Sequence, residues 1–273
     1  MKDVFVETDN VIRGSEAIER ALSDKQFGPG NGRRIVSIEG PAGTGKTAFM
    51  KRILPEYKGV MVRACETWKS PRPMLSDLAF VINGYYVAER SVHDLLVRVT
   101  EDVVCRELKV LVFDEADYFE SGGRYELLNL ARDIADITGC LIIFLSVGRL
   151  AARFARPGPY TATVTSRLAA RVQFRRASLD DAILLSEGLL EIVFEDDLVA
   201  DCLTRSEGSL RLLLSLFREI EGMAVAAGIH RLSLAKWNQM SALSGLPARA
   251  ERRTKPSRTG SAVSIVADRS NIA

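Results

Sequence analysis

Short apolar runs alternate with longer amphipathic segments through the first two thirds of the chain. Each run is nearly continuous, which is typical of a strand that is covered on both faces of a parallel sheet. The predicted strands cover residues 34–39, 59–65, 108–113, 139–146 and 171–174. Helical spacing follows the first strand, covers 74–86 and 125–138, and begins again at Ser91, where Asp94 completes a capping box. The alternation predicts an α/β fold, a parallel sheet with helices on both faces.

After Ser178 the pattern changes to helices alone. Ser178 is followed by acidic first-turn residues, which is typical of a helix N-cap. Helical runs lie at about 180–192, 195–205, 209–227 and 233–243, and beyond Gly245 the composition predicts a disordered basic tail. We expect four parts: an N-terminal segment and helix (1–30), an α/β nucleotide-binding domain (31–177), a small all-α lid (178–245) and the tail (246–273).

The turn after the first predicted strand has the phosphate-loop spacing G-x-x-x-x-G-K-S/T. Its glycines let successive backbone N–H groups point at one anion, and the N-terminus of the next helix adds partial positive charge. Lys46 would reach the β- and γ-phosphates of ATP, and the Thr47 hydroxyl would hold Mg²⁺. The residues expected to bind the nucleotide are Gly40, Pro41, Ala42, Gly43, Thr44, Gly45, Lys46, Thr47 and Ala48.

Acidic residues follow the strand at 108–113, in the order Asp114, Glu115, Ala116, Asp117. The carboxyl ends of parallel strands form the ligand-binding edge of such sheets, so these side chains should face the phosphate loop. Asp114 would then hold Mg²⁺, and Glu115 would orient and polarise the attacking water as a general base. The pair predicts a hydrolase rather than a passive nucleotide binder.

Composition and charge bear on location, on cysteine chemistry and on contact with nucleic acid. No apolar stretch approaches the ~18 residues of a membrane span, and the N-terminus lacks an apolar signal segment, so we expect a cytoplasmic protein without membrane contact. The four cysteines are widely spaced and the histidines are only two, which favours reduced thiols over disulfides or metal sites. Net charge is +2, but residues 247–273 hold six basic and two acidic side chains, which leaves −2 on the rest. Contacts of that body with nucleic acid must therefore use local basic rows.

A phosphate-loop sheet domain followed by a helical lid resembles the AAA+ ATPases, which are P-loop NTPases. Ser146 ends the strand after the acidic one, where that superfamily places its sensor 1 residue. Arg167 precedes the last strand, where many members carry an arginine finger, and Arg171 is the alternative finger. Arg211 opens a lid helix like the sensor 2 arginine, which can touch the γ-phosphate. The resemblance implies catalytic roles for Ser146 and Arg167, and nucleotide contact for Arg211.

Within AAA+, the chain resembles the transposition target-selection ATPases of the MuB and TnsC type over about residues 4–243. The resemblance rests on the run at 5–8 before a helix, the Asp-Glu-Ala-Asp strand end at 114–117, the pair at 149–150, and the lid run at 208–228. We expect the chain to lack the extra N-terminal domain of the phage Mu protein, and Val147 stands where that protein has Asn. The resemblance implies ATP-dependent rings or helical filaments on duplex DNA of any sequence, which activate a DDE-type transposase.

Such an assembly needs phosphate contacts that repeat along the duplex. We expect them from arginines on loops and helix starts of the sheet domain, with solvated surface charge as the alternative for each: Arg90, Arg124, Arg153 and Arg156. A second functional class stays open, a helicase loader of the DnaC kind or a signalling ATPase of the STAND kind that acts on a protein partner. The two classes differ in whether the ATP-bound protein coats DNA of any sequence.

Overall fold

The structure is a computed structural model that describes residues 1–2, 4–23, 32–86, 88, 91–119, 125–155, 158 and 161–243. The chain divides into two compact units, Met1–Leu234 and Ala235–Ala273. In the second unit the described part lies within one helix, α11 (Leu234–Leu243), and the predicted tail at 246–273 falls outside the described residues. No helix in the described ranges has both the length and the apolar character that crossing a membrane requires.

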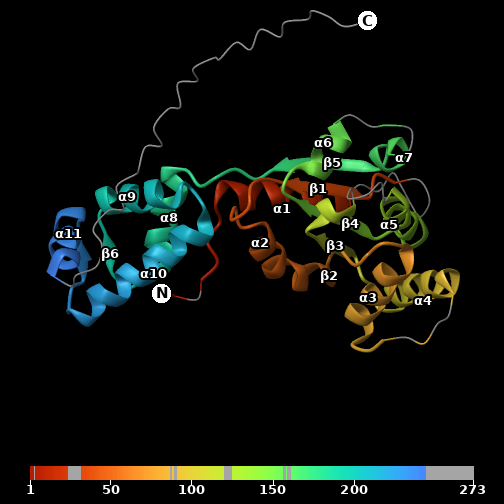
Figure 1. Cartoon of the computed structure of the whole chain (residues 1–273), viewed down its shortest axis with the longest axis horizontal. Coiled ribbons are helices and arrows are strands. Elements are labelled where there is room, and N and C mark those ends of the chain that lie inside the picture. Colours follow the sequence, from red (N-terminus) through yellow and green to blue (C-terminus); the bar gives the residue numbers. More distant parts are fainter. Residues whose placement is uncertain are drawn as a thin grey trace, which may run out of the picture. The chain divides into compact units, whose positions relative to one another are not determined.

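Five parallel strands form the central sheet of the first unit, in the order β2-β3-β4-β1-β5 (Figure 1). They are β1 (Ile35–Glu39), β2 (Gly59–Arg63), β3 (Val110–Asp114), β4 (Leu141–Ser146) and β5 (Leu168–Gln173). The predicted parallel sheet is confirmed. The last strand begins at Leu168 rather than at 171, because an edge strand keeps its first residues partly exposed and shows no continuous apolar run.

Seven helices and two 3-10 turns surround this sheet within the described ranges. They are α1 (Asp9–Ser23), α2 (Lys46–Ile53), α3 (Pro71–Asn83), α4 (Val92–Cys105), α5 (Tyr125–Thr138), α6 (Arg149–Ala155), α7 (Ala162–Thr165), η1 (Leu54–Tyr57) and η2 (Ala116–Phe119). α3 begins at Pro71, ahead of the predicted 74, since the fixed φ of proline suits a first helical turn. Ser91 caps α4 as predicted, and its Oγ accepts the Asp94 N–H at 3.0 Å.

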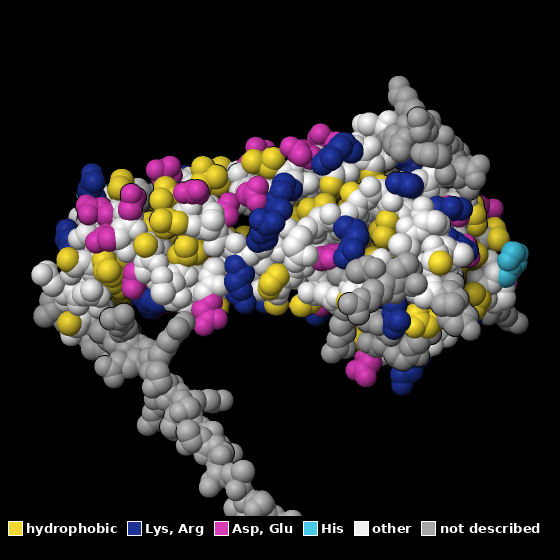
Figure 2. All heavy atoms as spheres, turned by 90° about the horizontal axis from the view of Figure 1, so that it is seen from above, with side chains coloured by type: hydrophobic (Ala, Val, Ile, Leu, Met, Phe, Trp, Pro, Cys, Tyr) yellow, Lys and Arg dark blue, Asp and Glu magenta, His cyan; other side chains and the backbone are white. Residues whose placement is uncertain are grey.

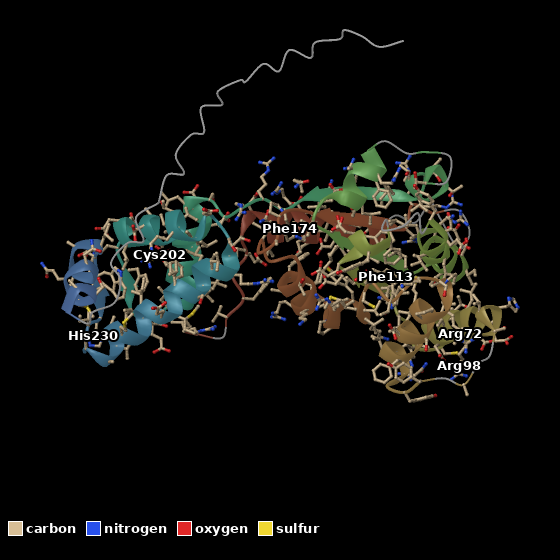
Figure 3. The ribbon with its side chains drawn as sticks, viewed as in Figure 1. Arg72, Arg98, Phe113, Phe174, Cys202 and His230 are labelled. Atoms are coloured by element: carbon tan, nitrogen blue, oxygen red, sulfur yellow. The ribbon has the colours of Figure 1, made fainter. Side chains whose placement is uncertain are left out.

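Alternate residues of the central strands enter two separate hydrophobic clusters. On β3, Leu111 and Phe113 pack with residues of α3, α4 and α5, whereas Val110 and Val112 pack with residues of α1 and α2. All four side chains are buried. Phe174, which follows β5, belongs to the second cluster, so Phe113 and Phe174 in Figure 3 mark the two faces of the sheet. The prediction of helices on both faces is therefore confirmed.

The chain after β5 is mostly helical, as predicted, with α8 (Leu179–Leu189), α9 (Asp196–Ser206) and α10 (Leu210–Ala226). Ser178 and Asp181 form a complete capping box at the start of α8. The prediction of an all-α lid is incomplete, because β6 (Val193–Phe194) and β7 (Arg231–Leu232) pair as a small parallel sheet. Strands of two residues are too short to leave a periodic pattern in the sequence.

Asn10 of α1 ties the end of the sheet domain in place. Its amide Nδ2 donates to the Arg175 carbonyl at 2.7 Å, and its Oδ1 accepts the Arg175 N–H at 2.9 Å. The next two residues bond to the turn before α10 instead: Arg176 Nη1 donates to the Glu207 carbonyl at 3.0 Å, and Ala177 N to the Gly208 carbonyl at 2.9 Å. The segment between β5 and α8 is thus held from both sides.

All four cysteines are free of disulfide bonds, and Cys105 is exposed. Cys140 and Cys202 are buried, and Figure 3 labels Cys202 among the lid helices. Burial raises the pKa of the Cys140 thiol to about 11 and that of Cys202 to about 12. Both thiols stay protonated at neutral pH, so they serve packing rather than nucleophilic chemistry.

Candidate nucleotide-binding site

The loop between β1 and α2 has the backbone conformation that its glycines predict. Gly43 and Gly45 have φ of 81° and 89°, in the left-handed region that side-chain-bearing residues rarely adopt. A Cβ on Gly43 would also meet the Ser209 hydroxyl at 2.3 Å, so a larger residue does not fit there. Gly45 is the N-cap of α2, which places the first turn of that helix at the base of the loop.

Lys46 is the first residue of α2, and its side chain is buried against the loop. Its Nζ donates to the carbonyl oxygens of Gly40 at 2.6 Å and Pro41 at 3.0 Å. Burial lowers the pKa of Lys46 below its ordinary value, while the nearby carboxylates, Asp114 above all, act in the opposite direction. The ammonium is therefore positioned inside the loop and is stabilised there by negative charge.

Thr47 and Asp114 meet across the sheet edge. Thr47 Oγ1 donates to Asp114 Oδ2 at 2.9 Å, and the other carboxylate oxygen of Asp114 accepts the Glu115 N–H at 2.9 Å. A hydroxyl and a carboxylate are the hard oxygen donors that Mg²⁺ prefers, and this ion commonly uses only one or two protein ligands beside nucleotide phosphates. The predicted metal pair is thus brought together and fits Mg²⁺.

Glu115 stands at the carboxyl edge of β3 with φ of 54°, a conformation that is uncommon for a residue other than glycine. Its carboxylate lies 3.7 Å from the guanidinium of Arg63, the last residue of β2. Sequence reasoning missed Arg63, although β2 and β3 pair in a register that sets Arg63 beside Asp114. Glu115 therefore has a cationic neighbour at the edge of the cleft.

Ser146 lies at the end of β4, where its carbonyl accepts the N–H of Gly40 at 3.2 Å. The residue is 1% exposed, and within the described ranges its Oγ has no hydrogen-bond partner. Buried hydroxyls are nearly always paired in native proteins, so an unpaired one that lines a cleft indicates a contact with something that binds there.

The lid closes one side of this cleft. The backbone N–H of Arg211, in the first turn of α10, lies 3.4 Å from the carbonyl oxygen of Gly43, and Arg211 itself is exposed. The cleft has a volume of about 480 Å³. It is lined by Ala42, Gly43, Thr44, Gly45, Lys46, Thr47, Ala48, Lys51, Asp114, Glu115, Leu145, Ser146, Val147, Leu210, Arg211 and Leu214. Most of the predicted nucleotide-binding residues thus gather in one place.

Arg167 and Arg171, the two candidate fingers, do not reach this cleft. Arg167 precedes β5 at the amino edge of the sheet, and its guanidinium bonds to Asp136 of α5 at 3.0 Å. Arg171 bonds through Nε and Nη2 to the buried carboxylate of Glu39, at 3.0 and 3.2 Å. Neither arginine can act on a nucleotide bound in its own chain in this arrangement.

Of the four arginines predicted to contact DNA, Arg90, Arg124 and Arg156 lie outside the described residues. Arg153 is on α6, with its guanidinium 5.5 Å from the centroid of the Tyr125 ring. On the face in Figure 2, the lysine and arginine side chains that are drawn in colour lie scattered among acidic and apolar ones. This face is therefore not uniformly positive.

Comparisons with known proteins agree with this geometry. Residues 30–154, just under half of the chain, match the family described as AAA domain. No curated protein matches the chain. Among solved structures, the Aeropyrum pernix ORC1 protein in complex with DNA is 19% identical with a TM-score of 0.57, and the match covers 89% of this chain and 66% of that one.

Two further structures are similar. Cdc6p from Pyrobaculum aerophilum is 17% identical (TM-score 0.62, covering 90% of this chain and 73% of that one). The Aeropyrum pernix ORC2 protein, with ADPNP and ADP, is also 17% identical (TM-score 0.62, covering 88% and 70%). The chain spans about two thirds of the length of the ORC1 protein. At these identities the likeness shows the fold, which is the P-loop AAA+ fold with a helical C-terminal part.

Proposed function

We propose that this protein is an ATPase whose nucleotide site is shared between the sheet domain and the lid. One observation carries the proposal: Lys46, the pair of Thr47 and Asp114, and Glu115 line a single cleft that α10 borders through Arg211. A cleft that combines a phosphate loop, oxygen ligands for a metal and a further carboxylate, that of Glu115, is built for phosphoryl transfer to water.

Each group has a distinct task in that reaction. Lys46 would exchange the loop carbonyls for the β- and γ-phosphates, and Thr47 with Asp114 would hold Mg²⁺, which neutralises phosphate charge when bound. Glu115 would take a proton from the attacking water. Ser146 would donate a hydrogen bond from its unpaired hydroxyl to the γ-phosphate. Arg211 would contact the same phosphate from α10 and so couple the position of the lid to the bound nucleotide.

The first test is nucleotide binding. Lys46→Ala should lower the affinity for a fluorescent ATP analogue at least about tenfold, because it removes the buried charge at the centre of the loop. Titration calorimetry with Mg²⁺ and a non-hydrolysable analogue gives the same quantity without a label. Lys69→Ala, an exposed lysine that does not line the cleft, is the matched control. Equal affinity in Lys46→Ala and wild type would remove the phosphate-loop role.

The finer function that we propose is target selection in DNA transposition. The ATP-bound protein would assemble into rings or filaments on duplex DNA without sequence preference and activate a DDE-type transposase. Support comes from the resemblance to MuB and TnsC, and from the likeness of fold to an ORC1 protein that was solved in complex with DNA. The alternative is a loader or signalling ATPase whose partner is a protein alone.

DNA binding separates these alternatives. With a non-hydrolysable ATP analogue, the protein should shift unrelated duplexes equally, and affinity should fall steeply with salt, because neutralised phosphates release counterions. Arg153→Ala, Arg90→Ala and Arg124→Ala should each reduce the slope of log affinity against log salt by about 1 without creating sequence preference. Arg20→Ala, on the outside of α1, is the control with no expected effect. An active ATPase that does not bind DNA would favour the protein-partner alternative.

A further inference from the structure

The last acid of the Asp-Glu-Ala-Asp run has two long-range partners that its position in the sequence does not suggest. Asp117 lies in η2, directly after the strand end that carries Glu115. Its Oδ2 accepts the N–H of Val147 at 2.5 Å, and its Oδ1 accepts the N–H of Leu150 at 3.0 Å. Both carboxylate oxygens are therefore used, each by a different backbone donor from the segment after β4.

These two donors lie in different structural elements, one directly after β4 and the other in α6. Val147 follows Ser146, the residue whose buried hydroxyl lines the cleft without a partner in the described ranges. Leu150 is in the first turn of α6, where backbone N–H groups have no partner within the helix and favour a negative acceptor. A charged acceptor makes both bonds stronger than neutral ones. Asp117 thus fixes the end of β4 and the start of α6 with one group.

The backbone of a single short turn, η2, connects Asp117 to Glu115. The Tyr118 N–H donates to the Glu115 carbonyl at 3.1 Å, and the Glu115 N–H donates to Asp114 Oδ1. Ala116 and Phe119 of the same turn are fully buried. The turn is therefore anchored in the core, and the Asp117 carboxylate links it by direct hydrogen bonds to the loop at Val147 and to the start of α6.

We infer that Asp117 is a positioning residue that sets the catalytic turn of Glu115 against the Ser146 strand end and α6. The inference rests on the proposed ATP hydrolysis, which it deepens. Asp117 does not line the cleft, so it acts through its two backbone partners and not on the nucleotide. Because misplacement by about 1 Å can slow a reaction about 10²-fold, loss of this link should affect turnover far more than binding.

The test uses the whole chain and separates kcat from affinity. Asp117→Asn retains one acceptor oxygen and presents an amide donor to the other N–H, so one of the two bonds is lost. We expect kcat for ATP to fall at least about tenfold, while affinity for a non-hydrolysable analogue stays within about twofold. Val147→Pro removes the backbone N–H that donates to Asp117 Oδ2. The preceding residue, Ser146, ends β4 in the extended conformation that a following proline requires. The fall in kcat caused by Val147→Pro should not add to the fall caused by Asp117→Asn when both changes are made in one variant.

Asp94→Asn is the matched control, because it makes the same change of carboxylate to amide at a helix start that does not line the cleft. Its kcat should equal that of wild type. Normal kcat in Asp117→Asn, a parallel fall in affinity, or additive losses in the double variant would each overturn the inference. If Asp117→Asn does not fold, Asp117→Glu, which keeps the charge but displaces the carboxylate by one methylene, decides by the same split between kcat and affinity. Absence of hydrolysis by the wild-type chain would instead reject the proposed function, and the inference with it.

Discussion

Arg167→Ala should reduce ATP turnover by up to about 10³-fold, and Lys46→Ala protein should partly restore it on mixing. Arg167 lies at the amino edge of the sheet, whereas the cleft lies at the carboxyl edge, so in the proposed assembly this arginine would act on the nucleotide of a neighbouring subunit. A mixed interface joins the intact nucleotide site of one variant to the intact arginine of the other. Steady-state phosphate release, measured over a range of mixing ratios, gives the rescue directly.

The ion pair with Asp136 makes this prediction more specific. In the proposed assembly Arg167 would have to exchange Asp136, to which it is paired in this structure, for a phosphate of the neighbouring subunit's nucleotide. Arg171→Ala is the control, since Arg171 is engaged with buried Glu39 and should not be rescued in trans. If Arg171→Ala shows rescue on mixing and Arg167→Ala does not, the finger is Arg171. If neither variant is rescued while both are folded, the chain has no finger at these positions.

Glu115→Gln should bind ATP with nearly wild-type affinity and hydrolyse it about 10²-fold more slowly, or slower still. The amide keeps the size of the side chain and cannot accept a proton from water. Assemblies on DNA should then persist after ATP addition, which filter binding or electron microscopy can follow over time. Glu101→Gln, an exposed carboxylate on α4, is the control for loss of one negative charge. Turnover at the wild-type rate in Glu115→Gln would mean that another group is the base.

The sequence predicts the sheet and the nucleotide site because both depend on short-range signals. Continuous apolar runs mark β1, β3 and β4, and the spacing of glycines with Lys46 marks the loop. The carboxyl edge of a parallel sheet then brings Asp114 to Thr47 without any further information. Local residue chemistry and the topology of a parallel sheet are therefore enough to predict the sheet and the nucleotide site from the sequence.

Other features depend on contacts that no local pattern encodes. The neighbour of Glu115 is Arg63, set by strand register, and the partners of Asp117 lie 30 and 33 residues away. Arg167 bonds to an aspartate on α5 that sequence reasoning did not connect with it. Predictions for these residues require the packed structure, because strand register and helix packing determine which side chains meet.

The two hydrogen bonds between Asn10 and Arg175 define where the sheet domain ends and the lid begins. The peptide of Arg175 is bonded to Asn10 of α1, whereas Arg176 is bonded to the turn that precedes α10. The contacts of the chain thus change from α1 to the lid between two adjacent residues. The junction is therefore a short hinge and not a long linker. Because the first turn of α10 contacts Gly43, we expect a small rotation at this hinge to shift the phosphate loop.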